Sequence, residues 1–316
     1  MAINKIVKTK TMQELLSESN ESSAREVFGK FLYEGELGIL FGDSNTGKSI
    51  LSNDMAFFVS GGGHEWEGMV SPHIPSLYID LEMTDKQFVN RYSDASKQIP
   101  ETYRRTSVDT LMCDEEEVFS FVQSVIISQQ GEVNPPKFII IDNITNGFGS
   151  IFSPSKMRQL VSELKSLKNK FGLTILLIAH CPKRKTNTPI TDNNLGGSKM
   201  LINFCDSAFA IAPSIVGNDI KYIKQIKTRE GAKMEKVMTM QIVSEPYLCM
   251  KCIGMAEEDA HINPKNEELC MLEITPEIEI KLVRLLMEDI LDYDEIANTL
   301  GIRKQTVINY AIRHYL

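Results

Sequence analysis

A short glycine-rich stretch constrains this chain more than any other part of its sequence. It follows an apolar run rich in β-forming residues, 37–41, and precedes a helix-compatible segment, 50–60. A strand, a loop and a helix in this order are what a phosphate-binding loop requires. The stretch has the pattern G-x-x-x-x-G-K-S and consists of Gly42, Asp43, Ser44, Asn45, Thr46, Gly47, Lys48 and Ser49.

The residue types of this loop suit the binding of a nucleoside triphosphate. Gly42 and Gly47 let the backbone curl so that N–H groups and the N-terminus of the next helix face phosphate oxygens. Lys48 supplies a positive charge to the β- and γ-phosphates, and Ser49 offers a hydroxyl to Mg²⁺. The sequence therefore predicts that residues 42–49 bind ATP and Mg²⁺. The alternative is a chance match on a glycine-rich turn.

Three apolar strands are expected to end in polar side chains. In open parallel α/β sheets, ligands bind beyond the carboxyl ends of the strands. A strand that is apolar on both faces also requires helices on both sides of its sheet. The three are 76–81, followed by Glu82; 137–143, which carries Asp142; and 173–179, followed by His180.

These positions allow roles to be assigned. Asp142 fits the acid that organises Mg²⁺ together with Ser49. Glu82 is a candidate to orient and polarise the attacking water, although it could instead be a helix N-cap or a solvated acid. His180 could sense the γ-phosphate or be a packed core residue.

Composition narrows the class of protein. The 316 residues include 42 acidic and 34 basic side chains, so nucleic acid could bind only through a local basic patch. The start of the sequence has no apolar signal-peptide core and no run is long enough to span a membrane, so we expect a cytoplasmic protein without a membrane partner. The six cysteines are scattered, as expected for free thiols, and Cys249-x-x-Cys252 lacks the further ligands of a structural zinc site.

Two groups of cations are candidate contacts. A proline-broken loop after His180 carries Lys183, Arg184 and Lys185, and Lys199 follows in the same region; these could contact phosphodiesters or simply be solvated. Lys227 and Arg229 lie at the tip of a predicted hairpin between strands 220–226 and 236–243. They could reach a neighbouring subunit's nucleotide, where such an arginine accelerates hydrolysis by on the order of 10³ to 10⁵. The alternative is ordinary hairpin charge.

The C-terminal segment, 276–316, is expected to form a separate helical unit. Its pattern resembles a helix-turn-helix, in which Ala297 permits a close helix crossing, Gly301 permits the turn and Val307 packs the second helix on the first. Such units bind either DNA or a protein partner, and the sequence is compatible with both functions. The side chains that the second helix would present are Arg303, Lys304, Gln305, Thr306 and Asn309.

The order of these motifs resembles the RecA-like core of DnaB-type and RepA-type hexameric helicases, over roughly residues 34 to 245. In that family the residue matching Glu82 is the catalytic base, and the one matching His180 couples the γ-phosphate to the DNA loops. The residues matching Lys227 and Arg229 reach into the adjacent subunit's site. The sequence departs from the family after His180, where the loop differs, and in residues 1–33, which cannot hold a DnaB-like N-terminal domain.

The resemblance implies an α/β fold with a RecA-like P-loop core, a mainly parallel sheet with antiparallel additions. We expect an N-terminal arm (1–33), an ATPase core (34–250), a linker (251–275) and a small all-α helix-turn-helix domain (276–316). We expect a homo-oligomer, most simply a hexamer, that holds single-stranded DNA in its ring loops and duplex DNA at its C-terminal domain.

The expected activity is Mg²⁺-dependent ATP hydrolysis by a helicase-like protein that serves replication or mobilisation of a plasmid or mobile element. One alternative is an ATP-switched DNA-binding regulator or recombination accessory ATPase that does not unwind DNA. The other is a nucleotide-dependent assembly protein whose tail docks a protein partner.

Overall fold

The computed structural model describes residues 10–14, 25–66, 68–108, 115–147, 154–183, 185, 187–195, 199–263, 276–288, 290–300, 302, 306–308 and 310–311. The strands are β1 (Glu26–Phe28), β2 (Leu32–Tyr33), β3 (Leu37–Gly42), β4 (Ser76–Asp80), β5 (Tyr103–Ser107), β6 (Phe138–Asp142), β7 (Thr174–His180), β8 (Ser207–Pro213), β9 (Ile220–Lys227), β10 (Val237–Val243) and β11 (Cys249–Ala256). The helices are α2 (Lys48–Val59), α3 (Asp85–Tyr92), α4 (Glu115–Gln129), α5 (Ile144–Gly147), α6 (Pro154–Phe171), α7 (Lys199–Phe204), α8 (Glu258–Ile262), α9 (Pro276–Glu288) and α10 (Tyr293–Leu300), with short 3-10 helices at Ser93–Ala95 and Asp192–Asn194.

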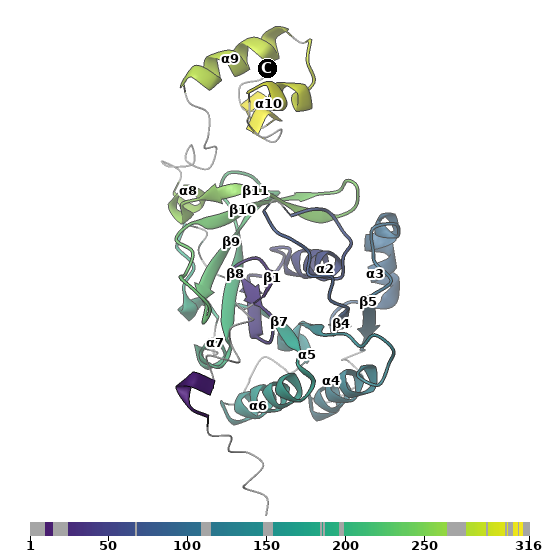
Figure 1. Ribbon diagram of the computed structural model, residues 1–316. Helices are drawn as coiled ribbons and strands as arrows, with labels where there is room; N and C mark the ends of the chain where they lie inside the picture. Colours follow the sequence, from purple (N-terminus) through teal and green to yellow (C-terminus); the bar gives the residue numbers. More distant parts are fainter. Residues whose placement is uncertain are drawn as a thin grey trace, which may run out of the picture.

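One nine-stranded sheet carries the architecture, in the order β11-β10-β9-β8-β3-β7-β6-β4-β5. The strands from β8 to β5 are parallel, and β9, β10 and β11 extend the sheet with antiparallel pairings (Figure 1). The register aligns Gly42 with His180 and Asp80 with Asp142 at the carboxyl ends of the parallel strands. The strand ends predicted to carry the site therefore meet at one edge.

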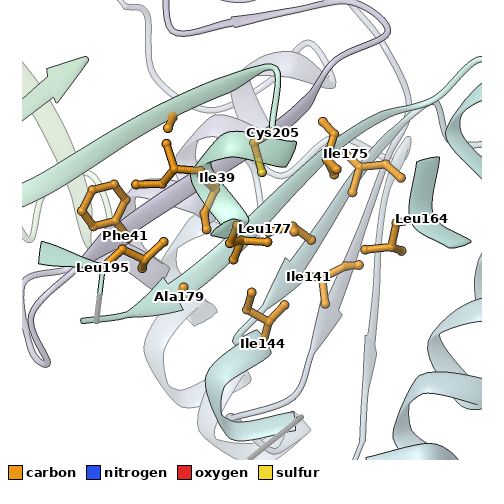
Figure 2. Close-up of a cluster of buried hydrophobic side chains, with 14 of the residues drawn as sticks. Ile39, Phe41, Ile141, Ile144, Leu164, Ile175, Leu177, Ala179, Leu195 and Cys205 are labelled. Carbon is orange, nitrogen blue, oxygen red and sulfur yellow. The ribbon is translucent and has the colours of Figure 1, made fainter. Parts of the chain in front are cut away.

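Helices cover both faces of the sheet, as the continuous apolar strands require. Alternate residues of β3 point to opposite faces: Ile39 and Phe41 pack with α4 and α6, whereas Leu40 packs with α2. Figure 1 shows α2 on one side of the sheet and α4 and α6 on the other. Figure 2 shows the first of these cores, where side chains from β3, β6 and β7 meet Leu164 of α6. The two cores hold the central strands, and hence the strand ends, in place.

The packed structure extends beyond the segment expected to form the core. β1 and β2 lie within the predicted arm, and Phe28 and Leu32 are buried against α2 and the only tryptophan, Trp66. At the other end, β11 continues the sheet past residue 250 by pairing with β10. β1 and β2 are short, and β11, although eight residues long, mixes apolar with polar residues. β1 and β11 both pack on α2, and this contact depends on residues that are distant in the sequence.

The region expected to be mainly helical, 85–131, also contains a strand. β5 pairs in parallel with β4 at the edge of the sheet, between α3 and α4. Its five residues, Tyr-Arg-Arg-Thr-Ser, are all half-buried. A polar edge strand has no apolar alternation, and for this reason its sequence gave no strand signal.

The C-terminal segment is helical, as expected. α9 and α10 are followed by helical residues at 306–308 and 310–311. Leu282, Ile296, Ala297, Val307 and Tyr310 are buried together and form a small core of their own. The backbone N–H of Ile302 donates to the Ala297 carbonyl at 3.0 Å, which closes the turn after α10. Fold class is thus confirmed: an α/β protein with a mainly parallel sheet, antiparallel additions and a helical C-terminal region.

We predict that Ile175→Ala lowers the free energy of unfolding by about 2–5 kcal/mol, since it leaves a cavity in a core that cannot collapse around it. Ile175 lies on β7 and has 0% exposure (Figure 2). The measurement is urea unfolding followed by the fluorescence of Trp66. Ile127→Ala is the matched control, because Ile127 on α4 is 48% exposed, and it should change stability by no more than about 0.5 kcal/mol. Equal effects of the two variants would contradict the core described above.

Candidate nucleotide site

The glycine-rich loop joins the end of β3 to the start of α2, and its two glycines are sterically required. A Cβ on Gly42 would lie 2.3 Å from the carbonyl oxygen of Ile211 on the neighbouring strand. Gly47 has φ of 91°, which side-chain-bearing residues rarely adopt, and its Cβ would lie 2.2 Å from the Cε of Met250. The Thr46 hydroxyl donates to the Asp43 carbonyl at 2.9 Å and fixes the loop internally. The N-terminus of α2 is therefore presented next to a curled backbone, as anion binding requires.

Lys48 is folded over this loop. Its side chain is buried, and Nζ donates to the carbonyl oxygens of Gly42 at 3.0 Å and Asp43 at 2.7 Å. Burial lowers the pKa of Lys48, and the negative charge of Asp142 opposes this effect most strongly. The structure thus holds a largely desolvated amine at the mouth of the loop, where a phosphate would be its natural counterion.

Asp142 ends β6 as a buried carboxyl group with one free oxygen. Tyr78 on β4 donates to Oδ2 at 2.5 Å, while Oδ1 is buried and has no hydrogen-bond partner among the described residues. Burial raises the pKa of Asp142 to about 6, and the nearby hydroxyls of Tyr78 and Ser49 oppose that rise. A buried carboxylate oxygen without a partner, beside a serine hydroxyl, is a donor set that fits Mg²⁺. Ser49 and Asp142 are the residues that would hold it.

Glu82 and His180 come together beside Lys48. The Nε2 of His180 lies 3.7 Å from Oε2 of Glu82, and the amide of Asn143 donates to the same oxygen at 3.2 Å. The pKa of Glu82 lies below its ordinary value, mainly because His180 and then Asn143 hydrogen-bond to the carboxylate. The positive charge of Lys48 adds to this effect, and burial opposes it. The Glu82 side chain is 40% exposed, so water can contact its carboxylate.

The alternatives raised by the sequence can be compared with this geometry. The helix N-cap of α3 is Thr84, which forms a capping box with Gln87, so Glu82 does not have that role. His180 is half-buried and faces Glu82, and it is not enclosed in the core. Its backbone N–H donates to the Thr145 hydroxyl at 3.0 Å, which fixes the end of β7.

Two residues that the sequence reasoning missed hold Glu82 in place. Asp80 is fully buried, and its Oδ1 accepts the backbone N–H groups of Glu82 at 3.0 Å and Met83 at 2.7 Å. Arg105 on β5 pairs with Oδ2 of Asp80 at 2.8 Å and with Asp85 at 2.5 Å. Asp80 could have been predicted as a site residue, because it is an acidic residue at the end of an apolar strand, two residues before Glu82. Arg105 could not have been, because β5 itself was not predicted.

Tyr78 and Asn143 were missed as well. Each donates to one of the two acids of the site, Tyr78 to Asp142 and Asn143 to Glu82. Both are fully buried within or directly after a parallel strand. Both could have been predicted as site residues, because a polar side chain in or beside an apolar strand is expected to be buried and to need a hydrogen-bond partner.

Lys227 and Arg229 lie at the opposite edge of the sheet. Lys227 pairs with Ala208 at the amino end of β8, which is parallel to β3. Ala208 is level with Ile39, three residues before Gly42. With about 3.3 Å per residue along the strand and about 4.8 Å for each of the two strand spacings, Lys227 lies on the order of 14 Å from the start of the phosphate loop. Its Nζ donates to the carbonyls of Ile202 at 2.9 Å, Asn203 at 3.1 Å and Cys205 at 2.7 Å, at the end of α7.

Arg229 is held more loosely. Its Nη1 lies 2.8 Å from Oδ1 of Asp206, and its side chain is 56% exposed. Neither Lys227 nor Arg229 is therefore part of the nucleotide site of its own chain. The structure leaves Arg229 accessible to a neighbouring molecule.

The candidate nucleic-acid contacts are described only in part. Lys183 and Lys185 are exposed, and Thr306 is half-buried. Lys199 begins α7, but its side chain lies outside the described part of the structure. Arg184, Arg303, Lys304, Gln305 and Asn309 also lie outside the described residues.

Comparison with known proteins agrees with this geometry. Residues 4–186, more than half of the chain, match the family model described as "AAA domain". No curated protein matches the sequence significantly. Among solved structures, the chain is similar to the flagellar accessory protein FlaH from Methanocaldococcus jannaschii, with 15% identity, a TM-score of 0.51, and coverage of 72% of this chain and 92% of FlaH. None of the described helices has both the length and the apolar character of a membrane span. The chain belongs to the AAA domain family and is a nucleotide-dependent ATPase with a RecA-like P-loop fold.

Proposed function

We propose that this chain is a Mg²⁺-dependent ATPase that acts on DNA as an oligomeric, helicase-like motor in replication or mobilisation of a plasmid or mobile element. The observation that carries the proposal is the division of charged groups between two edges of one sheet. Lys48, Glu82 and Asp142 converge at the carboxyl edge, whereas Arg229 is exposed at the amino edge. A head-to-tail arrangement of copies brings these two edges together at each interface.

In the proposed reaction each residue of the carboxyl edge has one role. Lys48 leaves the loop carbonyls and contacts the β- and γ-phosphates. Ser49 and Asp142 would hold Mg²⁺, which would supply positive charge to neutralise the phosphates when bound. Glu82 accepts a hydrogen bond from the attacking water and orients it toward the γ-phosphate, a role that suits a partly exposed carboxylate.

The contact between Glu82 and His180 offers a route from hydrolysis to DNA. His180 ends β7 and the basic loop with Lys183 and Lys185 follows it directly. A change of hydrogen bonding at Glu82 would move the end of β7 and hence the start of that loop. We propose that the loop contacts single-stranded DNA and that the C-terminal helices, as a helix-turn-helix, contact duplex DNA.

The proposed assembly is a homo-oligomeric ring, most simply a hexamer. Arg229, and Lys227 once it releases the carbonyls at the end of α7, would approach the γ-phosphate bound by the adjacent subunit. Cations supplied in this way stabilise the charge that develops on the transferred phosphoryl group. A cytoplasmic location follows from this function.

We predict that Glu82→Gln lowers the rate of ATP hydrolysis by about 10²- to 10⁴-fold while ATP binding is kept, because the amide cannot accept a proton from water but retains the size of the acid. Lys48→Ala is the contrasting variant and should lose binding itself. Binding of a fluorescent ATP analogue and release of phosphate are the two measurements. Normal turnover by Glu82→Gln would assign the base elsewhere.

We predict that Arg229→Ala and Lys48→Ala, each inactive alone, recover ATPase activity when mixed. In an equal mixture about a quarter of the interfaces would pair an intact loop with an intact arginine, by random assortment around a closed ring. The control is a mixture of Lys48→Ala with Glu82→Gln, in which both lesions affect the same side of the interface and no activity should return. Failure of the first mixture at every ratio would show that Arg229 does not act between subunits.

We predict ATP-dependent release of the labelled strand from a forked duplex, with ATP hydrolysis stimulated by single-stranded DNA. Stimulation without strand release would instead identify an ATP-switched regulator or accessory ATPase. Binding of DNA should weaken steeply with added salt, because phosphate contacts release counterions. Weak binding that salt does not change, with no stimulation of hydrolysis, would overturn a DNA function and favour an assembly protein whose tail docks a protein.

A further inference from the structure

Three metal-binding side chains meet behind the phosphate loop, outside the nucleotide site. They are Asp54 on α2, His64 in the loop after α2, and Cys249, the first residue of β11. One ligand atom from each lies within 4.8 Å of the other two. The three segments are far apart in sequence, and α2 and β11 pack on one another.

Asp54 is the residue that most needs a partner. It is 1% exposed, and its Oδ2 accepts the backbone N–H of Met250 at 2.6 Å. The hydroxyl of Tyr247 interacts with this carboxyl group, yet Oδ1 makes no hydrogen bond of normal geometry within the described structure. Leaving a buried carboxyl oxygen unsatisfied costs more than most hydrogen bonds contribute.

The other two groups are similarly placed. Cys249 is fully buried as a free thiol. His64 lies with its Nδ1 3.5 Å from the Tyr247 hydroxyl, and its Nε2 is buried without a hydrogen-bond partner among the residues described. Its ring packs against that of Trp66, with 5.0 Å between centroids, which limits its freedom to turn toward solvent.

We propose that Asp54, His64 and Cys249 bind Zn²⁺. One sulfur, one nitrogen and one oxygen are a ligand set that zinc accepts and that the hard cations Mg²⁺ and Ca²⁺ do not. Ligands around tetrahedral zinc lie roughly 3.3–3.6 Å apart, so the three groups must approach one another by at most about 1.5 Å. Three protein ligands leave one position for a water molecule or hydroxyl, and Tyr247 is the neighbouring hydroxyl.

This site does not depend on the Cys249-x-x-Cys252 pair, which by itself lacks the ligands of a structural zinc site. Cys252 is the second cysteine of the C-x-x-C pair, but it does not belong to the cluster, because the partners of Cys249 come from α2 and the loop that follows it. The site would brace the edge strand β11 against α2. Since Met250 contacts the end of the phosphate loop at Gly47, the brace would also support that loop from behind.

The test is metal binding by the full chain, prepared without a polyhistidine tag and with its metal removed. Addition of ZnCl₂ in the presence of a competing chelator dye should show one site. Cys249→Ser and His64→Gln should each weaken zinc binding by about 100-fold or more. Mutation of residues that only hydrogen-bond to metal ligands already weakens binding by about 10- to 100-fold, and these two residues would be ligands themselves. Cys252→Ser and His73→Gln are the matched controls and should bind zinc as the natural sequence does.

Cobalt gives an independent readout of the sulfur ligand. With CoCl₂ the natural sequence should show a thiolate-to-cobalt charge-transfer band in the near ultraviolet, which Cys249→Ser loses and Cys252→Ser keeps. Trp66 emission and circular dichroism establish that each variant is folded before metal is added. The proposal is overturned if the folded natural sequence binds no zinc in competition with the dye, or if Cys249→Ser and His64→Gln bind it equally well.

Discussion

The burial of two opposite charges at one edge of the sheet is the constraint on which the rest of the structure depends. Lys48 and Asp142 are both nearly inaccessible to water, and Oδ1 of Asp142 has no hydrogen-bond partner among the described residues. Raising the pKa of Asp142 from 3.8 to about 6 means that its ionised form costs on the order of 3 kcal/mol at neutral pH. That cost is absent below the ordinary pKa of 3.8, grows as pH rises from 3.8 to the raised pKa of about 6, and is fully present above it. The packed cores on both faces of the sheet must offset it, so the fold maintains a site in which ligand binding relieves electrostatic strain.

The placement of β7 between β3 and β6 determines how the site is built. Because β7 lies beside both, His180 ends level with Gly42 of the phosphate loop on one side and extends past the end of β6 on the other, where Leu177 pairs with Ile141. Glu82 reaches the same point from β4, and Asp80 with Arg105 fixes the turn that carries it. The ends of β3, β4, β6 and β7 thus converge, although these strands are far apart in the sequence. The order of the strands in the sheet determines which side chains meet at the site, and no single local sequence motif contains all of them.

This explains how far the sequence alone could predict the molecule. The phosphate loop and the strands that end at Glu82, Asp142 and His180 were predictable, because each depends on a local pattern and on the rule that ligands bind beyond carboxyl strand ends. β5 and β11 were not, since a polar edge strand and a strand without regular apolar alternation are defined only by the strands with which they pair. Arg105 and Tyr78 were missed for the same reason, because their partners are long-range.

The two cations at the amino edge look equivalent in sequence, but the structure separates them. Lys227 donates to three carbonyls at the end of α7, and moving it would remove a partner from each, including the part-buried bonds to Ile202 and Cys205. Arg229 is held by one ion pair to Asp206, and its own side chain is 56% exposed. The buried Asp206 would keep Lys168 and the backbone N–H of Leu37 as partners if Arg229 moved away. Releasing Arg229 therefore costs little compared with releasing Lys227. If copies of the chain assemble as proposed, Arg229 is the one of the two that could contact a neighbouring nucleotide without disturbing the fold, whereas Lys227 holds the end of α7 within its own chain.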